Sequence, residues 1–197
     1  MGRKAGVTAE QTRAELLAAA ARVFALKGYD GASIADICNE AGLSTGPVYA
    51  HYGSKAELFV AVLEAHGHGQ YRELIGSGQV TDVADFLTQA GSTYDRRPAA
   101  DAALVIEAIV ASKRDPEVAA LVSSWLTSGE ELLAATIKQA QDAGVLDDRV
   151  RPETISRLAT MLALGSFLTA ALDVDKLDHD DWARLIALLV DSVRPTP

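Results

Sequence analysis

The chain has 197 residues, with 18 Lys and Arg against 27 Asp and Glu, so its formal net charge at pH 7 is −9. Hydrophobic residues make up 49% and charged residues 23%, which is a globular balance and excludes a disordered chain. Taken alone, the acidity argues against a nucleic-acid partner, because phosphates repel a negative surface. The single cysteine, Cys38, excludes a disulfide framework and a cysteine-based zinc site.

Neither a membrane span nor a secretory signal is expected from the sequence. No uninterrupted apolar run reaches the roughly 18 residues that a spanning helix needs. The first ten residues, 1–10, contain no apolar segment of the kind that secretory signals have. We therefore expect a cytoplasmic protein that does not enter a membrane.

Apolar residues recur at spacings of three and four along the chain, which predicts an all-α fold. Side-chain caps predict four helix starts near the N-terminus: Thr8 with Gln11, Ser33 with Asp36, Ser44, and Ser54 with Glu57. Glycines predict the ends of the first two helices, at Gly28 and Gly42. Three short helices and a connecting fourth are therefore expected in this part of the chain.

Longer helices are expected further along. Pro98, Pro116 and Pro152 each precede an apolar-periodic run, and proline favours the first turn of a helix. The last two of these runs cover 116–143 and 152–172, and a final helix is expected over 180–193. The sequence thus predicts a small N-terminal three-helix module that a connecting helix joins to a larger C-terminal helical bundle. We place the boundary after residue 53, which gives domains of 1–53 and 54–197.

Residues 28–55 have the pattern of a helix-turn-helix. The turn between two short helices needs a left-handed residue, and Gly42 adopts that conformation without the steric penalty of a Cβ. Apolar residues that can pack the two helices together are Ile34, Ile37, Cys38, Ala41, Leu43 and Val48. The second helix, about 45–51, would then lie in the major groove of double-stranded DNA.

The same stretch resembles the DNA-binding signature of the TetR family of regulators. The matching residues are Gly28-Tyr29, Ser33-Ile34-Ala35-Asp36-Ile37 and Ala41-Gly42-Leu43-Ser44-Thr45-Gly46-Pro47-Val48-Tyr49-Ala50-His51-Tyr52-Gly53-Ser54-Lys55-Ala56-Glu57-Leu58. Ser33, Cys38 and Tyr52 replace the usual Thr, Ala and Phe, and each keeps the physical role. The resemblance implies a DNA-binding transcriptional regulator, by family expectation a repressor, that binds a palindromic double-stranded DNA operator.

The resemblance also implies which residues contact DNA. They are Arg3, Lys4, Ser33, Ser44, Thr45, Gly46, Pro47, Tyr49, His51 and Lys55. The hydroxyls of Ser33 and Ser44, together with Tyr49, His51 and Lys55, would hold phosphates. The side chains of Thr45 and Pro47 would face base edges, Gly46 would allow a close backbone approach, and the N-terminal tail would reach a minor groove.

Other roles remain open for several of these residues. Tyr49 and Tyr52 can both be core aromatics, and we expect phosphate contact for Tyr49 and core packing for Tyr52. Arg3 and Lys4 can instead form a solubilising tail. The expected recognition helix has no Arg, Asn or Gln, so we expect DNA shape and phosphate positions to supply most of the specificity.

The resemblance gives the C-terminal bundle two tasks, dimerisation and the binding of a small-molecule inducer. The runs at 116–143 and 152–172 carry more apolar surface than one inward face requires, which favours a homodimer through these two long helices. The interface residues expected are Leu121, Trp125, Leu132, Leu158, Leu162, Gly165, Ser166 and Thr169. Ordinary core packing within one subunit is the alternative.

Aromatic, histidine and sulfur side chains and one carboxylate are candidates for the inducer pocket. They are His66, Tyr71, Phe86, Tyr94, Glu107, Trp125, Met161 and Phe167. Glu107 lies in an apolar run, so its carboxylate is expected to face solvent or to be buried and paired; inside a pocket it would suit a cationic inducer. Apolar side chains at helical spacing can equally be core. Inducer binding would tilt the fourth helix, with Gly67 and Gly69 as a possible hinge.

An enzyme is not expected, and neither is a cofactor or a bound metal. No G-x-S-x-G, phosphate-binding glycine loop or H-E-x-x-H motif occurs, and His66 and His68 lie on nearly opposite sides of a helix. A constitutive DNA-architectural protein without an inducer and a pure dimerisation module are the alternative functions.

The net charge divides unevenly between the two parts of the chain. Residues 1–55 hold six Lys and Arg against five Asp and Glu, a net of +1, and residues 56–197 hold 12 against 22, a net of −10. The acidic excess therefore belongs to the expected sensor part, which should face away from DNA. A near-neutral contact module predicts weak non-specific binding and a modest salt dependence.

Overall fold

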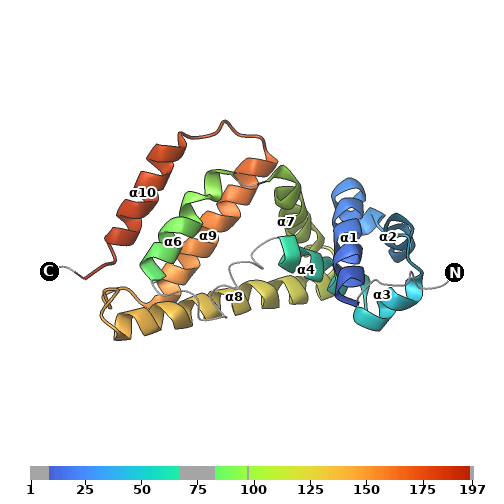
Figure 1. The fold of residues 1–197 in the computed structure, drawn as a ribbon, viewed down its shortest axis with the longest axis horizontal. Helices are drawn as coiled ribbons and strands as arrows, with labels where there is room; N and C mark the ends of the chain where they lie inside the picture. The colour runs from blue at the N-terminus through green and yellow to red at the C-terminus, as the bar shows by residue number, and fades with distance from the viewer. Residues whose placement is uncertain (1–8, 67–82, 97, 196–197) are drawn as a thin grey trace.

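A computed structural model describes residues 9–66, 83–96 and 98–195 of the chain. Every regular element in these three stretches is helical (Figure 1), so the predicted all-α fold is confirmed. In chain order the elements are α1 (Ala9–Gly31), α2 (Ile34–Ala41), α3 (Thr45–His51), α4 (Lys55–His66), α6 (Val83–Ser92), the 3₁₀ turn η1 (Tyr94–Arg96), α7 (Ala99–Ala111), α8 (Pro116–Asp142), α9 (Pro152–Ala171) and α10 (His179–Asp191).

The helices α2 and α4 begin at side-chain caps, whereas the predicted cap of α3, Ser44, makes no side-chain cap hydrogen bond. The Ser33 Oγ accepts the Asp36 N–H at 3.1 Å, and the Asp36 carboxylate accepts the Ser33 N–H at 3.0 Å, which is the predicted capping box of α2. Gly42 ends α2 with a φ of 66°, a left-handed conformation that glycine adopts without strain. At the start of α4 the Ser54 Oγ accepts the Glu57 N–H at 3.1 Å, as predicted.

The prolines mark the starts of the longer helices. Pro116 and Pro152 occupy the first turns of α8 and α9, where no intrahelical partner for their missing N–H is needed. Pro98 instead lies one residue before α7, as its N-cap. The predicted cap at Thr8 lies outside the described residues, and α1 begins at Ala9 in the part that is described.

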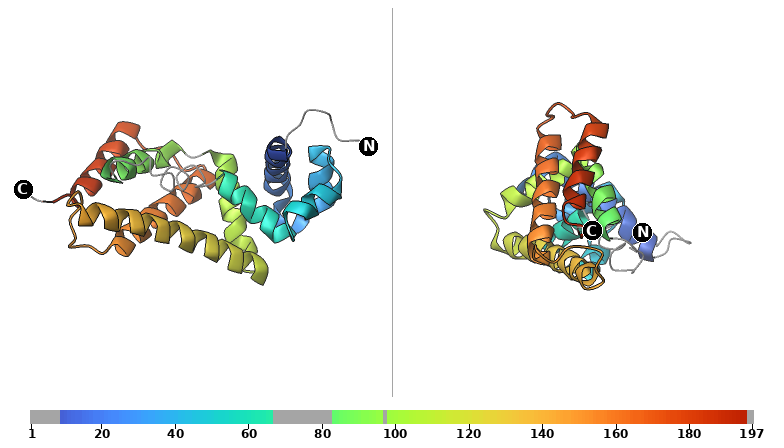
Figure 2. Two further views of the ribbon diagram at one scale, coloured as in Figure 1. Left: turned by 60° about the horizontal axis from the view of Figure 1, so that its bottom comes forward. Right: turned by 90° about the vertical axis from the view of Figure 1, so that its left-hand side faces the viewer.

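The helices form an elongated molecule (Figures 1 and 2). The helices α1, α2 and α3 lie at one end, α4 and α7 follow, and the long α8 runs toward the other end, where α6, α9 and α10 gather. The predicted three-helix module, connecting helix and larger helical bundle are therefore present.

Two apolar cores hold this arrangement together. The first contains Phe24 and Phe59 of the N-terminal helices together with Val105, Val118 and Phe167 of α7, α8 and α9. It is continuous across residue 53, so the proposed domain boundary, which remains a prediction, is not a gap in packing. The second core joins α6, the C-terminal half of α8 and α10 through Val83, Ile137, Leu146, Ile186 and Val190.

The helix α9 exposes more apolar surface than a core helix does. Among the described helices it is the one that is long and apolar enough to cross a membrane by length and composition, although Glu153 and Arg157 interrupt its apolar run. Only 28% of the apolar stretch is buried within the chain. A large part of the apolar face of α9 is therefore not covered by the described residues of the chain.

Candidate nucleic-acid interface and ligand cavity

The helices α2 and α3 pack through small and branched apolar side chains. Ile37 and Val48 have 0% exposure and Cys38 has 3%, so all three lie in the core of the module. Burial raises the pKa of the Cys38 thiol, which keeps the thiol neutral. The prediction that Cys38 is a small core residue is confirmed, and the packing fixes which face of α3 points outward.

The outward face of α3 carries residues that were expected to contact DNA. Thr45, Gly46, Tyr49 and His51 are all exposed, and Tyr49 has 58% of its surface open to solvent. Tyr52 has 7% exposure, and its hydroxyl oxygen accepts the Arg13 Nε–H at 3.2 Å. The structure thus confirms core packing for Tyr52 and leaves Tyr49 accessible, while the DNA contacts themselves remain predictions.

The two serines predicted to bind phosphate differ in their surroundings. Ser44 is the exposed N-cap of α3, and its side chain makes no cap hydrogen bond. The Ser33 hydroxyl donates to the Asp36 carboxylate at 2.7 Å. Hydrogen bonds from Lys27 and Ser33 hold the pKa of Asp36 at about 2, so a phosphate near Ser33 would meet a carboxylate that is ionised. The Ser33 hydroxyl therefore serves the α2 cap, and its phosphate contact remains a prediction.

Lys55 points away from the outward face of α3. Its ammonium donates to the Tyr29 carbonyl oxygen at 2.8 Å and to the Ala32 carbonyl oxygen at 3.1 Å, and it lies 4.2 Å from the centre of the Tyr29 ring. A cation is stabilised there by the carbonyl end of α1 and by the aromatic face. Lys55 therefore ties α4 to the end of α1, and its phosphate contact remains a prediction.

A kink at the end of α1 creates a second contact of this kind. Gly28 has a φ of 68° and a ψ of 173°, which breaks the helix at the position predicted for its end, although a last turn continues to Gly31. The Tyr29 N–H donates to the Glu107 carboxylate of α7 at 2.7 Å. Glu107 is half-buried and does not line the cavity described below. The expectation that the Glu107 carboxylate is paired is confirmed: it accepts a backbone N–H and joins the module to α7.

The start of α8 completes this junction. The Tyr29 hydroxyl donates to the Asp115 carboxylate at 3.1 Å, and the Ser54 hydroxyl donates to the Glu117 carboxylate at 2.6 Å. The Val118 N–H and the Tyr29 hydroxyl lower the pKa of Asp115, and burial together with Asp115 raises the pKa of the Tyr29 hydroxyl. Asp115 is therefore an ionised acceptor and Tyr29 a neutral donor. We call these contacts, with the Glu107–Tyr29 bond, the α1–α7–α8 junction.

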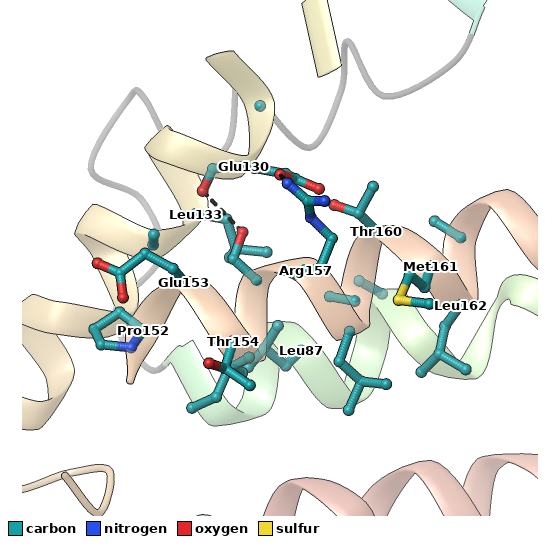
Figure 3. A pocket seen from close by; sticks show the side chains of 18 of the residues that line it. Leu87, Glu130, Leu133, Pro152, Glu153, Thr154, Arg157, Thr160, Met161 and Leu162 are labelled. Carbon is teal, nitrogen blue, oxygen red and sulfur yellow. Dashed lines mark hydrogen bonds and ion pairs between the residues drawn. The ribbon is translucent and has the colours of Figure 1, made fainter. Parts of the chain in front are cut away.

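A cavity of about 1460 Å³ lies between α6, α8, α9 and α10 (Figure 3). Four of the predicted pocket residues line it: Phe86, Tyr94, Trp125 and Met161. Phe167 has 1% exposure and belongs to the first core instead, so its predicted pocket role is corrected. Tyr71 and the side chain of His66 lie outside the described residues, as do Arg3, Lys4 and the side chain of Pro47.

Among the described residues, the charged groups that line the cavity are equal in number. Three are carboxylates (Glu130, Glu131, Glu153) and three are cations (Lys138, Arg151, Arg157). Glu130 pairs with Arg157 at 2.7 Å, and the Glu130 side chain is the more buried, with 17% exposure against 67% (Figure 3). Within the described residues, no group of three His, Cys, Asp or Glu side chains could hold a metal ion. The part of the cavity wall that the structure describes is therefore mostly apolar, and its formal charges cancel.

The long helix α8 is buried on more than one side. Val118, Val122, Trp125 and Ile137 are buried, because α8 packs against α4, α7 and α9. None of the large apolar side chains found exposed in the described chain lies on α8. The predicted dimer surface on 116–143, with Leu121, Trp125 and Leu132, is therefore corrected: its apolar surplus is used within the chain.

Exposed apolar residues instead form rows on α9 and α10, while others lie singly or in pairs on α1, α3, α7 and the loops. On α9 and its C-cap the exposed row is Leu158, Met161, Gly165, Leu168 and Leu172, at spacings of three and four, and on α10 it is Leu185, Leu188 and Leu189. We call these two rows the α9–α10 face. The residues predicted for the dimer surface include none from α10, although its leucines recur at helical spacing.

The other residues predicted for the dimer surface differ in exposure. Thr169 is exposed beside the α9–α10 face, and Leu162 is half-buried. Ser166 has 8% exposure and its hydroxyl donates to the Ala163 carbonyl oxygen at 2.6 Å. The predicted interface position of Ser166 is corrected, because the side chain faces the interior of its own subunit.

Comparison with known proteins gives matches to one group of regulators. Residues 16–62 match the family model described as bacterial regulatory proteins, tetR family. The HTH-type transcriptional regulator UidR of Escherichia coli (strain K12) is 27% identical over 160 residues, which cover 80% of each chain. The match to the family model therefore includes α2, α3 and the first part of α4.

Solved structures share the arrangement of the whole chain. Salmonella enterica GusR matches with a TM-score of 0.70 at 23% identity, over 92% of this chain and 94% of that one. NalD of Pseudomonas aeruginosa, described as the secondary repressor of the MexAB-OprM multidrug efflux pump, matches with a TM-score of 0.66 at 23% identity, over 96% and 100%. At these identities the likeness shows the fold.

Proposed function

The chain belongs to the TetR family of DNA-binding transcriptional regulators, and we propose that it is a repressor that a small molecule releases from its operator. The proposal that the chain binds DNA rests on the exposed face of α3, which the buried Ile37 and Val48 hold outward. The cavity between α6, α8, α9 and α10 supports a ligand, because it is large, mostly apolar and built on helices. We also propose a cytoplasmic location, since a repressor acts where its operator lies.

DNA recognition in this proposal uses the outward face of α3. Thr45 and Gly46 face base edges, while Ser44, Tyr49 and His51 hold phosphates on either side. Because no Arg, Lys, Asn or Gln occurs on α3, bidentate base contacts are absent from this helix. Specificity then depends on phosphate positions and on the shape of the operator.

The α9–α10 face is the proposed homodimer interface. Its leucines repeat at spacings of three and four on two neighbouring helices, so a second copy related by a two-fold axis would bury them in a four-helix arrangement. A two-fold dimer presents two copies of α3, which fits a palindromic operator. The acidic C-terminal part carries most of the negative charge, and this arrangement keeps it at the end away from DNA.

The helix α8 connects the cavity to the DNA-binding module, and we propose that a ligand causes release from the operator through this helix. This helix of 27 residues, about 40 Å long at 1.5 Å per residue, begins at the α1–α7–α8 junction and lines the cavity with its middle and end. A ligand that favours a different position of α8 against α9 would shift Asp115 and Glu117, and with them the two α3 helices. The spacing of the half-sites would no longer match, which is a population shift between two states of the dimer. The hinge expected at Gly67 and Gly69 lies outside the described residues.

Footprinting on DNA that flanks the protein's own gene, combined with a reporter, tests this function. We expect a protected site of two half-sites and higher reporter expression when the gene is deleted. Lower expression after deletion would mean that the protein activates, and would contradict the repressor. A protected site that no compound from a thermal-shift screen releases would favour the alternative, a constitutive DNA-architectural protein.

A further inference from the structure

Most cations of the DNA-binding module are held by groups of the chain itself. Between the start of α1 and the start of α4 the sequence has four Lys or Arg side chains. Arg22 pairs with Glu40 at 2.8 Å, and Lys27 pairs with Asp36 at 2.7 Å. The Lys55 ammonium donates to two carbonyl oxygens near the end of α1. Three of the four cations therefore have a charged or strongly polar partner within the chain.

Arg13 is the fourth of these cations, and its partner is different. Its side chain is exposed, and its Nε–H donates to the Tyr52 hydroxyl oxygen at 3.2 Å. Among the described residues no carboxylate forms an ion pair with it. A hydroxyl acceptor carries no charge, so this bond leaves the positive charge of the guanidinium uncompensated. The bond also leaves the two terminal amino groups of the guanidinium for another acceptor.

The hydrogen bond places Arg13 at the C-terminal end of α3. Tyr52 directly follows this helix as its C-cap, and the centre of its ring lies 6.4 Å from the centre of the His51 ring. His51 is exposed and is one of the residues proposed above to hold a phosphate. The carbonyl end of a helix also favours a nearby cation. The Arg13 guanidinium therefore lies next to a proposed phosphate contact.

The Tyr52 ring is a fixed anchor for this arginine. The ring has 7% exposure and belongs to the first core, so the position of its hydroxyl is set by packing. A long side chain held at one end loses less conformational freedom when it binds a second partner. Tyr52 stands where the signature that this stretch resembles usually has Phe, which offers no acceptor. The contact between Arg13 and Tyr52 therefore depends on a residue in which this chain departs from the signature.

We propose that Arg13 binds an operator phosphate beside the one that His51 holds, through the terminal amino groups of its guanidinium. A planar guanidinium presents paired N–H donors that match the oxygens of a phosphate. The helix α3 has no Lys or Arg, so Arg13 brings from α1 a full positive charge that the recognition helix lacks. This inference rests on the proposed DNA contacts of α3 and adds to them a residue of another helix.

The first test measures the salt dependence of DNA binding. The probe is the duplex that the wild-type chain enriches from a random pool, titrated in about 50–200 mM salt by fluorescence anisotropy. For Arg13→Gln the slope of log affinity against log salt should be smaller by about one unit for each bound subunit. Affinity at about 0.1 M salt should fall about tenfold for each subunit. Arg13→Lys keeps the charge and should retain the wild-type slope.

Two control variants separate the charge of Arg13 from its structural role. Tyr52→Phe breaks the same hydrogen bond but leaves the guanidinium in place, so the slope should not change. Arg22→Gln removes a charge from the same helix, where Glu40 already pairs with it, and should also leave the slope unchanged. Circular dichroism should show the wild-type helix content for all of these variants. A change in slope confined to Arg13→Gln would then report a lost phosphate contact.

The second test locates the phosphate by ethylation interference. Ethylation removes the charge of one phosphate at a time, so it weakens binding where the protein makes a contact. The wild type should show a sensitive phosphate in each half-site that is no longer sensitive in Arg13→Gln. Tyr52→Phe should retain that sensitivity. The phosphate should lie next to one whose sensitivity is lost in His51→Ala.

The outcomes distinguish this contact from the function on which it rests. An Arg13→Gln variant with the wild-type slope and the wild-type set of sensitive phosphates would overturn the Arg13 contact and leave operator binding standing. Equal losses of slope in Arg13→Gln and Tyr52→Phe would also overturn it, because the effect would then come from the shared hydrogen bond. A wild-type chain that enriches no duplex would overturn the proposed operator binding and the Arg13 contact together.

Discussion

The Glu107 carboxylate accepts the Tyr29 N–H at 2.7 Å, although 78 residues separate the two in sequence. The bond joins α7 to the kinked end of α1 and therefore positions the DNA-binding module. Glu107→Ala leaves a half-buried N–H without an acceptor, and we expect a loss of about 1–3 kcal/mol in unfolding free energy and weaker operator binding. Urea denaturation and DNA titration measure both. Glu107→Gln retains an acceptor oxygen, so a loss as large as that of the alanine variant would contradict this role.

Position 28 requires a glycine, because its backbone is left-handed and because Glu107 lies close to it. A Cβ at Gly28 would lie 3.1 Å from Glu107 Oε1 in a backbone with a φ of 68°. Gly28→Ala should therefore cost about 1–2 kcal/mol for the left-handed conformation, plus the displacement of the carboxylate. Gly31→Ala, whose Cβ would make an ordinary 3.6 Å contact with Lys27, is the control and should be neutral or slightly stabilising. If Gly28→Ala and Gly31→Ala change the midpoint of thermal unfolding equally, position 28 does not require a glycine.

Lys55 is expected to contribute to stability rather than to the salt dependence of DNA binding. Lys55→Met removes the ammonium that holds two carbonyl oxygens of α1, and charge-assisted hydrogen bonds of this kind contribute about 1.5–3 kcal/mol. The slope of log affinity against log salt should remain the same, since the ammonium faces α1 and not DNA. A slope smaller by about one unit would show that Lys55 neutralises a phosphate after all.

Tyr49 and Tyr52 provide a matched pair on neighbouring sides of the module. Tyr49→Phe removes an exposed hydroxyl and should weaken operator binding several-fold while leaving the unfolding free energy unchanged. Tyr52→Phe removes the acceptor of Arg13 and should lower the unfolding free energy by about 0.5–1.5 kcal/mol. It should have little effect on DNA affinity under conditions in which the variant is fully folded. Measuring both properties for both variants checks the assignment, and an exchange of the two effects would refute it.

Asp36 should make folding sensitive to acid. Lys27 and Ser33 lower its pKa from 3.8 to about 2 in the folded chain, so the unfolded chain takes up a proton first as the pH falls. The stabilisation by Asp36 is complete above about pH 4 and is lost as the pH falls toward 2. Asp36→Asn should flatten the unfolding free energy over this interval. Asp175→Asn, a change in the exposed loop before α10, is the control and should leave the fall in unfolding free energy with pH as steep as in the wild type. If Asp36→Asn also leaves this pH dependence unchanged, Asp36 is not its cause.

Local signals predicted much of the fold, because they act within a few residues. The capping box at Ser33 and Asp36, the left-handed Gly42, and the prolines at the starts of α8 and α9 each depend on neighbours in sequence. The helix-turn-helix and the outward face of α3 follow from the same local rules. Their positions could therefore be read without knowledge of the tertiary structure.

Long-range contacts could not be predicted in this way. Glu107 was expected to face solvent, to be paired or to meet a ligand, and Lys55 was expected to contact DNA. Their partners in the structure lie 78 and 26 residues away, and no spacing rule encodes that distance. The helix α8 has an apolar surface wide enough for a dimer, yet α4, α7 and α9 cover it. An apolar surplus reveals that a helix has several neighbours and does not reveal whether they belong to the same subunit.

Selection of binding sites from a random pool of double-stranded DNA tests whether the chain is a dimeric, operator-binding regulator. We predict that the full chain enriches an inverted repeat whose half-sites lie about 10 bp apart, or a multiple of one turn. The Leu168→Glu/Leu188→Glu variant should fail to enrich it under the same conditions. Failure of the wild-type chain to enrich any sequence, or enrichment of a single half-site equally by both proteins, would contradict a dimeric operator-binding regulator.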